Sequence, residues 1–261
     1  MWGHDSGVYD GPKGEFNIPL SPPISMADGI KYLGIPNVCV IRHGIGNEEY
    51  NRQFQQVKRI AWTLSMGSNH SYQDLKQYVF GLRDTMPNLT GYFLDDFFRF
   101  HDKPGFDKNC ETEPAPAALS LDELKQLHEE TLAYKRRLNL AIVLYTHLLC
   151  PAIKPYMKHI DTVSLWIWTG NDIGKIDDHF KKYRALVPDK PTLLGIYMWD
   201  FGGKKELAMS FMVRQLDTAL RLYKEGQIDG MIFHCTPLCN KNLAAVEYAK
   251  TWIAEHGGDK R

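Results

Sequence analysis

Two adjacent carboxylates end one of the most apolar stretches of the chain. Residues 91–98 read GYFLDDFF, so Asp95 and Asp96 are enclosed by hydrophobic and aromatic side chains. Aspartate is almost never fully buried alone, and a pair at the end of a buried strand needs hydrogen bonds or a chemical role in a cleft. Because side chains alternate along a strand, we expect Asp95 and Asp96 to face opposite sides of the sheet. The run predicts a catalytic pair in which Asp95 reacts and Asp96 supports it through backbone hydrogen bonds.

A second catalytic carboxylate is expected after a later apolar run. Asp200 follows residues 192–199 and would lie at the rim, which makes it our candidate partner for Asp95. Two carboxyl groups in different surroundings can divide the roles of proton donor and ionised carboxylate. The rivals for the partner role are Asp5, Glu111 and Glu113.

Polar and aromatic side chains also gather where the other apolar runs end. The bodies of these runs are apolar and their ends are not, which is what a shared pocket would produce. We predict that the following residues bind the substrate: Trp2, His4, Arg42, His43, Tyr145, His147, Trp166, Trp168, Trp199 and His234.

Eight short apolar runs recur along the chain, and helical periodicity follows most of them. Continuously apolar runs are typical of strands buried on both faces of a parallel sheet. The predicted strands are residues 1–6, 37–43, 59–66, 91–97, 140–147, 162–168, 192–199 and 230–235. The clearest helices are residues 71–85, 120–138, 176–186, 206–223 and 243–255, and shorter ones are residues 26–33, 48–58 and 152–159.

This alternation predicts a single (β/α)8 TIM barrel, an α/β fold, over residues 1–261. The length is close to the roughly 250 residues usual for that fold, whose active sites lie at the carboxyl ends of the strands. An open doubly wound sheet would carry a glycine-rich phosphate turn after its first strand, and residues 3–7 do not provide one. Two long segments, residues 7–25 and 101–119, would lie over the catalytic face.

The stretch Gly91-Tyr92-Phe93-Leu94-Asp95 resembles the fourth-strand motif of alpha-amylase-type glycoside hydrolases, with Phe93 in place of the motif's arginine. That resemblance implies that Asp95 faces the inside of the barrel, which leaves Asp96 facing the outer layer. More broadly, the chain resembles the superfamily of TIM-barrel glycosidases. That resemblance implies a glycosidase that cleaves a carbohydrate with paired carboxylates. Asp95 would act as nucleophile or electrostatic stabiliser, and Asp200 or a loop glutamate would act as general acid. Four of the six tryptophans lie at strand ends, where their faces could stack on sugar rings.

Two other functions fit the same residues. A metal-dependent barrel hydrolase or isomerase could use His4, His147, His234 and Asp95 as ligands, because imidazole and carboxylate groups bind divalent metals. A barrel that binds sugar without cleaving it is the other alternative. A serine hydrolase of the G-x-S-x-G type is not indicated, because the motif is missing. Our main interpretation requires no metal and no cofactor.

The amino-acid composition limits the classes of molecule that the protein is expected to bind. Lysine plus arginine and aspartate plus glutamate number 31 each, so the basic footprint of a nucleic-acid binder is missing. No apolar run is long enough to span a membrane. A small molecule or an oligosaccharide is the expected partner. The five cysteines are odd in number and favour free thiols over a disulfide framework. The N-terminus has no signal-peptide pattern, which favours a cytoplasmic location.

Overall fold

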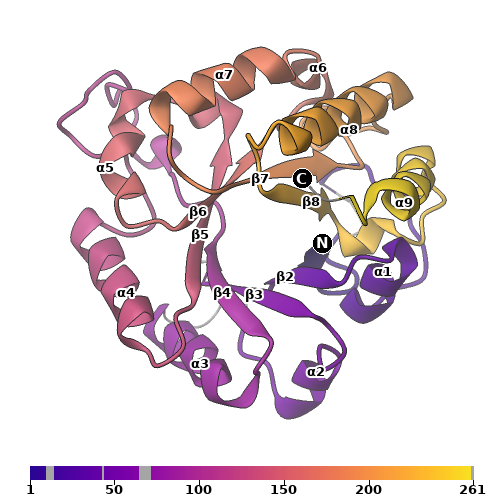
Figure 1. The fold of residues 1–261 in the computed structure, drawn as a ribbon, viewed down its shortest axis with the longest axis horizontal. Coiled ribbons are helices and arrows are strands. Elements are labelled where there is room, and N and C mark those ends of the chain that lie inside the picture. Colours follow the sequence, from indigo (N-terminus) through magenta and orange to yellow (C-terminus); the bar gives the residue numbers. More distant parts are fainter. Residues whose placement is uncertain (10–14, 43, 65–71, 260–261) are drawn as a thin grey trace.

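The computed structural model describes residues 1–9, 15–42, 44–64 and 72–259, and its strands form a closed parallel barrel. Each strand pairs with the next, and β8 closes on β1 where Trp2 lies opposite His234. Helices form an outer ring around the strands (Figure 1). The predicted (β/α)8 barrel is confirmed. The strands are β1 (Trp2–His4), β2 (Asn37–Ile41), β3 (Arg59–Thr63), β4 (Leu89–Leu94), β5 (Asn139–Tyr145), β6 (Thr162–Trp166), β7 (Thr192–Tyr197) and β8 (Gly230–His234).

Most of the helices lie where the periodicity predicts them, but residues 48–58 are helical only over the first five, and the short helix at residues 170–173 was not predicted. The helices are α1 (Met26–Leu33), α2 (Glu48–Arg52), α3 (Tyr72–Thr85), α4 (Leu121–Ala133), α5 (Lys154–Met157), α6 (Gly170–Ile173), α7 (Ile176–Leu186), α8 (Met209–Lys224) and α9 (Ala244–His256). Ser120 and Glu123 form the capping box that begins α4. The segment predicted as one helix over residues 152–159 instead forms the 3₁₀ turn η3 (Pro151–Ile153) and the short α5, because Pro155 has no N–H to donate within a longer helix.

All eight strands end one to three residues earlier than the sequence predicts, and the early ends of β4 and β7 change the predicted site. β4 stops at Leu94 because the N–H of Asp96 donates to the side chain of Asp95, at 3.0 Å, instead of to a neighbouring strand. β7 stops at Tyr197, whose N–H and C=O are both bound by the side-chain amide of Gln215 on α8, at 3.2 and 2.7 Å. The residues beyond these points therefore lie in loops at the mouth of the barrel.

The floor of the mouth is made by aromatic rings packed inside the barrel. Trp2 lies 4.9 Å from Phe93 and 5.1 Å from Trp166, measured between ring centroids. The indole N–H of Trp166 donates to the hydroxyl of Ser164 at 2.8 Å, which fixes the ring. Gly195 on the adjacent β7 leaves the space that the indole occupies, since an added Cβ would lie 2.1 Å from the ring.

We expect Gly195→Ala to lower the free energy of unfolding by about 1–3 kcal/mol, because the new methyl group must displace the fixed Trp166 ring. Urea denaturation measures the change. Gly81→Ala is the matched control: Gly81 lies exposed in α3 with nothing near its Cβ position, so alanine should stabilise by about 0.5–1 kcal/mol. Equal stability of Gly195→Ala and the wild type would contradict the packing argument.

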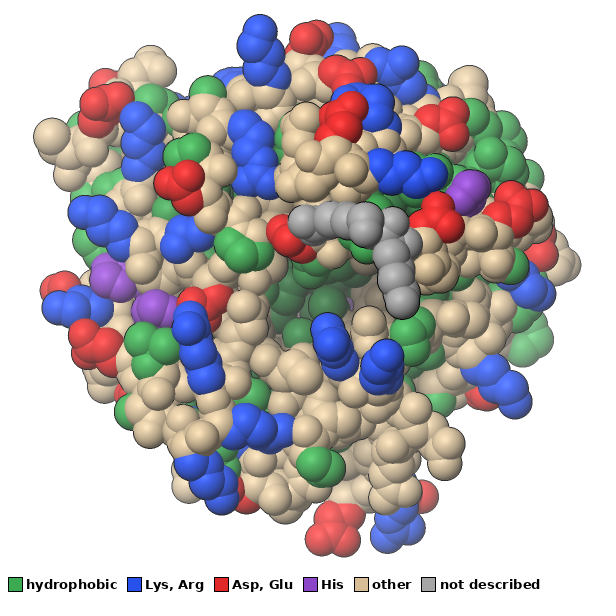
Figure 2. Space-filling view, viewed as in Figure 1, with side chains coloured by type: hydrophobic (Ala, Val, Ile, Leu, Met, Phe, Trp, Pro, Cys, Tyr) green, Lys and Arg blue, Asp and Glu red, His purple; other side chains and the backbone are tan. Residues whose placement is uncertain are grey.

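The surface carries charges of both signs. On the face that Figure 2 shows, Lys and Arg side chains are interspersed with Asp and Glu, and hydrophobic side chains lie at the bottom of a central hollow. Within the described part of the chain, no helix has both the length and the apolar character needed to cross a bilayer.

Candidate active site

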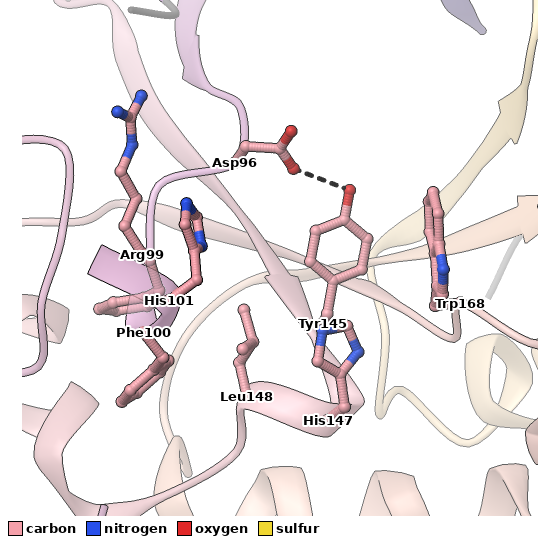
Figure 3. Close-up of a pocket in the computed structure, with 9 residues that line it drawn as sticks. Asp96, Arg99, Phe100, His101, Tyr145, His147, Leu148 and Trp168 are labelled. Carbon is pink, nitrogen blue, oxygen red and sulfur yellow. Dashed lines mark hydrogen bonds between the residues drawn. The ribbon is translucent and has the colours of Figure 1, made fainter. Parts of the chain in front are cut away.

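The turn after β4 directs both carboxylates into one place. Asp95 is the first residue beyond the strand and is partly exposed, whereas Asp96 is exposed. Asp96 has a φ of 44°, in the left-handed region that non-glycine residues rarely adopt. The expectation that Asp96 faces the outer layer is wrong, because this backbone angle ends the strand alternation and brings its carboxylate to the mouth. There Asp96 accepts a hydrogen bond of 3.0 Å from the Tyr145 hydroxyl (Figure 3).

An inner cavity of about 170 Å³ lies at the carboxyl ends of the strands. It brings together eight of the residues that the sequence singled out: Trp2, His4, Asp95, Asp96, Tyr145, Trp166, Trp168 and His234. Its remaining lining residues are Tyr9, Phe16, Val143, Tyr197 and Phe201. The cavity is thus walled mainly by aromatic rings, with two carboxyl groups among them.

An outer cavity of about 630 Å³ adjoins the inner one and shares Asp96, Tyr145 and Trp168 with it. His147 lies against Tyr145, with ring centroids 5.4 Å apart and planes inclined by 19°. The rest of the outer lining is Phe98, Arg99, Phe100, His101 and Leu148. Figure 3 shows Arg99, Phe100 and His101 on the side away from Trp168. Phe98, Arg99 and Phe100 come directly after β4, and His101 is the one lining residue from the loop predicted over residues 101–119.

The inner cavity makes Asp95 a weak acid. Removal from water raises the pKa of Asp95 to about 8, and the nearby charge of Asp96 adds to the rise, while the hydrogen bond from the Asp96 N–H opposes it. Burial also raises the pKa values of Tyr145 and Tyr197 well above their usual range. Burial, followed by the proximity of His4, lowers the pKa of His234 well below its usual range. At neutral pH, Asp95 is therefore a protonated carboxyl group beside neutral phenols and a neutral imidazole.

Asp200, the predicted partner of Asp95, lies outside both cavities. Its buried carboxylate accepts hydrogen bonds from the N–H groups of Gly170 and Gly203, at 3.0 and 2.8 Å. This arrangement joins the loops after β6 and β7. Trp199 also lies outside both cavities, and its indole N–H donates to the carbonyl of Phe16 at 3.0 Å. Both residues come after β7 has ended, so the strand alternation that predicted their directions does not apply.

The remaining candidates are spread around the rim. Arg42 pairs with Asp5 at 3.3 Å and lies over the ring of Tyr50, and it lines neither cavity. His43 falls outside the described residues. Glu111 pairs with Lys154 at 3.3 Å and Glu113 pairs with Lys103, so both loop glutamates are engaged in ion pairs.

Several cavity residues were missed in the sequence. Tyr197 has the same strand-end signal as Trp199, two residues earlier, and would have been found with a strand that ends at residue 197. Tyr9 and Phe16 belong to the long N-terminal segment, whose course over the mouth was predicted without naming side chains. Phe201 directly follows Asp200, and nothing in its local sequence distinguishes it from a core residue.

The predicted metal ligands are divided between the two cavities. His147 lines the outer cavity, whereas His4 and His234 line the inner one. Across residues 1–9, 15–42, 44–64 and 72–259, no three His, Cys, Asp or Glu side chains come close enough together to hold a metal ion. The geometry of this part of the chain does not support the metal-dependent alternative.

Solved structures with the same architecture include several that belong to carbohydrate-active proteins. A chitinase active domain 2 from Pyrococcus furiosus, solved with chito-oligosaccharides, has a TM-score of 0.54 and 12% identity, with 94% of each chain covered. A tamarind chitinase-like lectin has a TM-score of 0.52 and 10% identity, covering 91% of this chain and 93% of the lectin. An alpha-L-arabinofuranosidase from Thermotoga maritima has a TM-score of 0.50 and 11% identity, covering 88% of this chain and 63% of the arabinofuranosidase.

The chain shares the barrel fold of glycoside hydrolases. The fold that the resemblance to barrel glycosidases implies is therefore present. No protein-family model matches the chain, and no curated protein sequence matches it. The similarity to these solved structures therefore concerns the fold alone.

Proposed function

We propose that this protein hydrolyses a glycosidic bond with Asp95 as its general acid. The observation that carries the proposal is a cavity walled by aromatic rings, at the carboxyl ends of the barrel strands, that holds a carboxyl group whose pKa is raised to about 8. Aromatic faces offer a surface for the apolar faces of a sugar, and a carboxyl group that stays protonated at neutral pH can donate its proton to a leaving oxygen. The glycoside hydrolases that share the fold add support.

The reaction assigns different roles to the two carboxyl groups. Asp95 gives its proton to the glycosidic oxygen as the bond from that oxygen to the anomeric carbon breaks. Water adds to the anomeric carbon, and the proton that this water loses restores the protonated form of Asp95. Asp96, held by the Tyr145 hydroxyl at 3.0 Å, faces the positive charge that develops on the sugar ring. Asp95 fits the proton donor better than the nucleophile or electrostatic stabiliser first expected, since a protonated carboxyl group is a poor nucleophile and carries no charge.

Hydrolysis should depend on pH through Asp95. On substrates from a panel of aryl glycosides, kcat/KM should fall about tenfold per pH unit above roughly pH 8, because the active form carries the proton on Asp95. The measurement is a pH profile in buffers of constant ionic strength. A profile that stays flat through pH 9 would rule out Asp95 as the acid. Binding of sugars without any turnover would instead favour the alternative of a sugar-binding barrel.

A further inference from the structure

Three aromatic rings line the inner cavity but not the outer one. The residues that the two cavities share come from neighbouring strands: Asp96 follows β4, Tyr145 ends β5 and Trp168 follows β6. The rings of Tyr9, Phe16 and Phe201 follow β1 and β7 and contact one another, with centroids 5.1, 5.6 and 5.8 Å apart. These three rings form a continuous aromatic wall, which we call the end wall.

The end wall is held by the segment of residues 15–25, which we call the strap. The carbonyl of Phe16 accepts the hydrogen bond from Trp199, and the side-chain amide of Asn17 donates to the carbonyl of Lys204 at 3.1 Å. Further along, the Lys241 ammonium donates to the Pro19 carbonyl at 2.8 Å. These bonds tie the strap to the loops after β7 and β8. Phe16, the one ring of the end wall that lies on the strap, is therefore anchored at the mouth.

The size and charge of the inner cavity limit what it can hold. An apolar cavity of roughly 150 Å³ accepts benzene, a single six-membered ring, and the inner cavity measures about 170 Å³. Its described lining includes neither Lys nor Arg, so a negatively charged group would lie there against Asp95 and Asp96 without a cation to balance it. The outer cavity, at about 630 Å³, is several times larger. The inner cavity therefore has room for no more than one uncharged ring, and the outer cavity has room for a larger group.

We propose that the inner cavity holds one uncharged sugar ring at the end of a chain and that the outer cavity holds the leaving group, so that the enzyme releases single sugars from chain ends. This inference rests on the proposed function. The bond to be cleaved then crosses the junction between the cavities. Asp95 lines only the inner cavity and Asp96 lines both, so the two carboxyl groups flank that junction.

The test follows the products of neutral oligosaccharides labelled at the reducing end. Series of three to six rings built from glucose, N-acetylglucosamine or arabinose are incubated with the enzyme, and early products are separated by chromatography. Stepwise appearance of monosaccharide, with labelled chains one ring shorter each time, is the expected result. Internal cleavage that releases fragments of several rings would overturn the end-of-chain inference and leave the proposed hydrolysis intact. Absence of hydrolysis with every series would overturn the proposed function and, with it, single-sugar release.

Variants of the end wall give a second readout. Phe16→Ala and Phe201→Ala each open the wall, and we expect the ratio of released disaccharide to monosaccharide to rise at least about tenfold, which corresponds to about 1.4 kcal/mol. Leu20→Ala is the matched control, because Leu20 lies on the same strap but is 77% exposed and lines neither cavity. If both folded wall variants give the wild-type product ratio, the end wall does not limit the substrate and the inference is wrong.

Discussion

Asp95→Asn should lower kcat by about 10²–10⁴-fold, because asparagine cannot transfer a proton to the leaving oxygen. KM should change little, since the amide keeps the size of the carboxyl group and its ability to accept the Asp96 N–H. The measurement is steady-state kinetics at pH 6.5 on a glycoside that the wild type hydrolyses. Asp178→Asn is the control, because Asp178 is an exposed carboxylate on α7 outside both cavities. Activity of Asp95→Asn within threefold of the wild type would exclude Asp95 as the acid.

The same substitution should increase stability at pH 8. The pKa of Asp95 is raised from 3.8 to about 8 in the folded protein, so the folded state binds more protons than the unfolded state between these values. The free energy of unfolding contributed by this group therefore falls as pH rises through that window. Asparagine does not ionise, so the variant should gain stability relative to the wild type between pH 5 and pH 8 in urea denaturation. Loss of activity together with gained stability would separate a catalytic role from a structural one.

Asp96→Asn should lower kcat by about 10²–10³-fold, because the carboxylate that faces the developing positive charge is removed. It should also lower the pKa of Asp95, since the charge of Asp96 is one of the causes that raise it. The fall of kcat/KM at high pH should then begin at a lower pH than in the wild type. Burial is the larger cause, so the pKa of Asp95 should remain above its ordinary value.

Tyr145→Phe is the matched control for this prediction. It removes the hydroxyl that donates to Asp96 and keeps both the carboxylate and the ring that lines the two cavities. Its effect on kcat should be smaller than that of Asp96→Asn. An unchanged pH profile in Asp96→Asn would show that the two carboxyl groups do not interact, and would contradict the assignment of Asp96 as the partner of Asp95.

Much of the cavity follows from local sequence patterns. The apolar run of β4 and the polar residues after it predicted that Asp95 would lie at the mouth. The same pattern, a polar residue at the end of an apolar run, predicted Tyr145 and His234 as site residues. The pattern failed at β7, where Asp200 and Trp199 were assigned by continuing the alternation beyond the strand. The strand ends at Tyr197 because Gln215 from α8 binds the Tyr197 backbone, and a contact from eighteen residues away is invisible in the local pattern.

The sequence by itself determined the closed barrel and the end of it at which the acidic and aromatic residues meet. It could do so because buried parallel strands are continuously apolar and their carboxyl ends share one edge. Only the tertiary structure decided which carboxylate accompanies Asp95, because the left-handed backbone at Asp96 and the hydrogen bonds of Asp200 depend on neighbouring loops. It also decided the end wall, which joins segments nearly two hundred residues apart, such as Phe16 and Phe201. Asp95 shares the inner cavity with these distant rings, and burial there raises its pKa above the ordinary value of an aspartate.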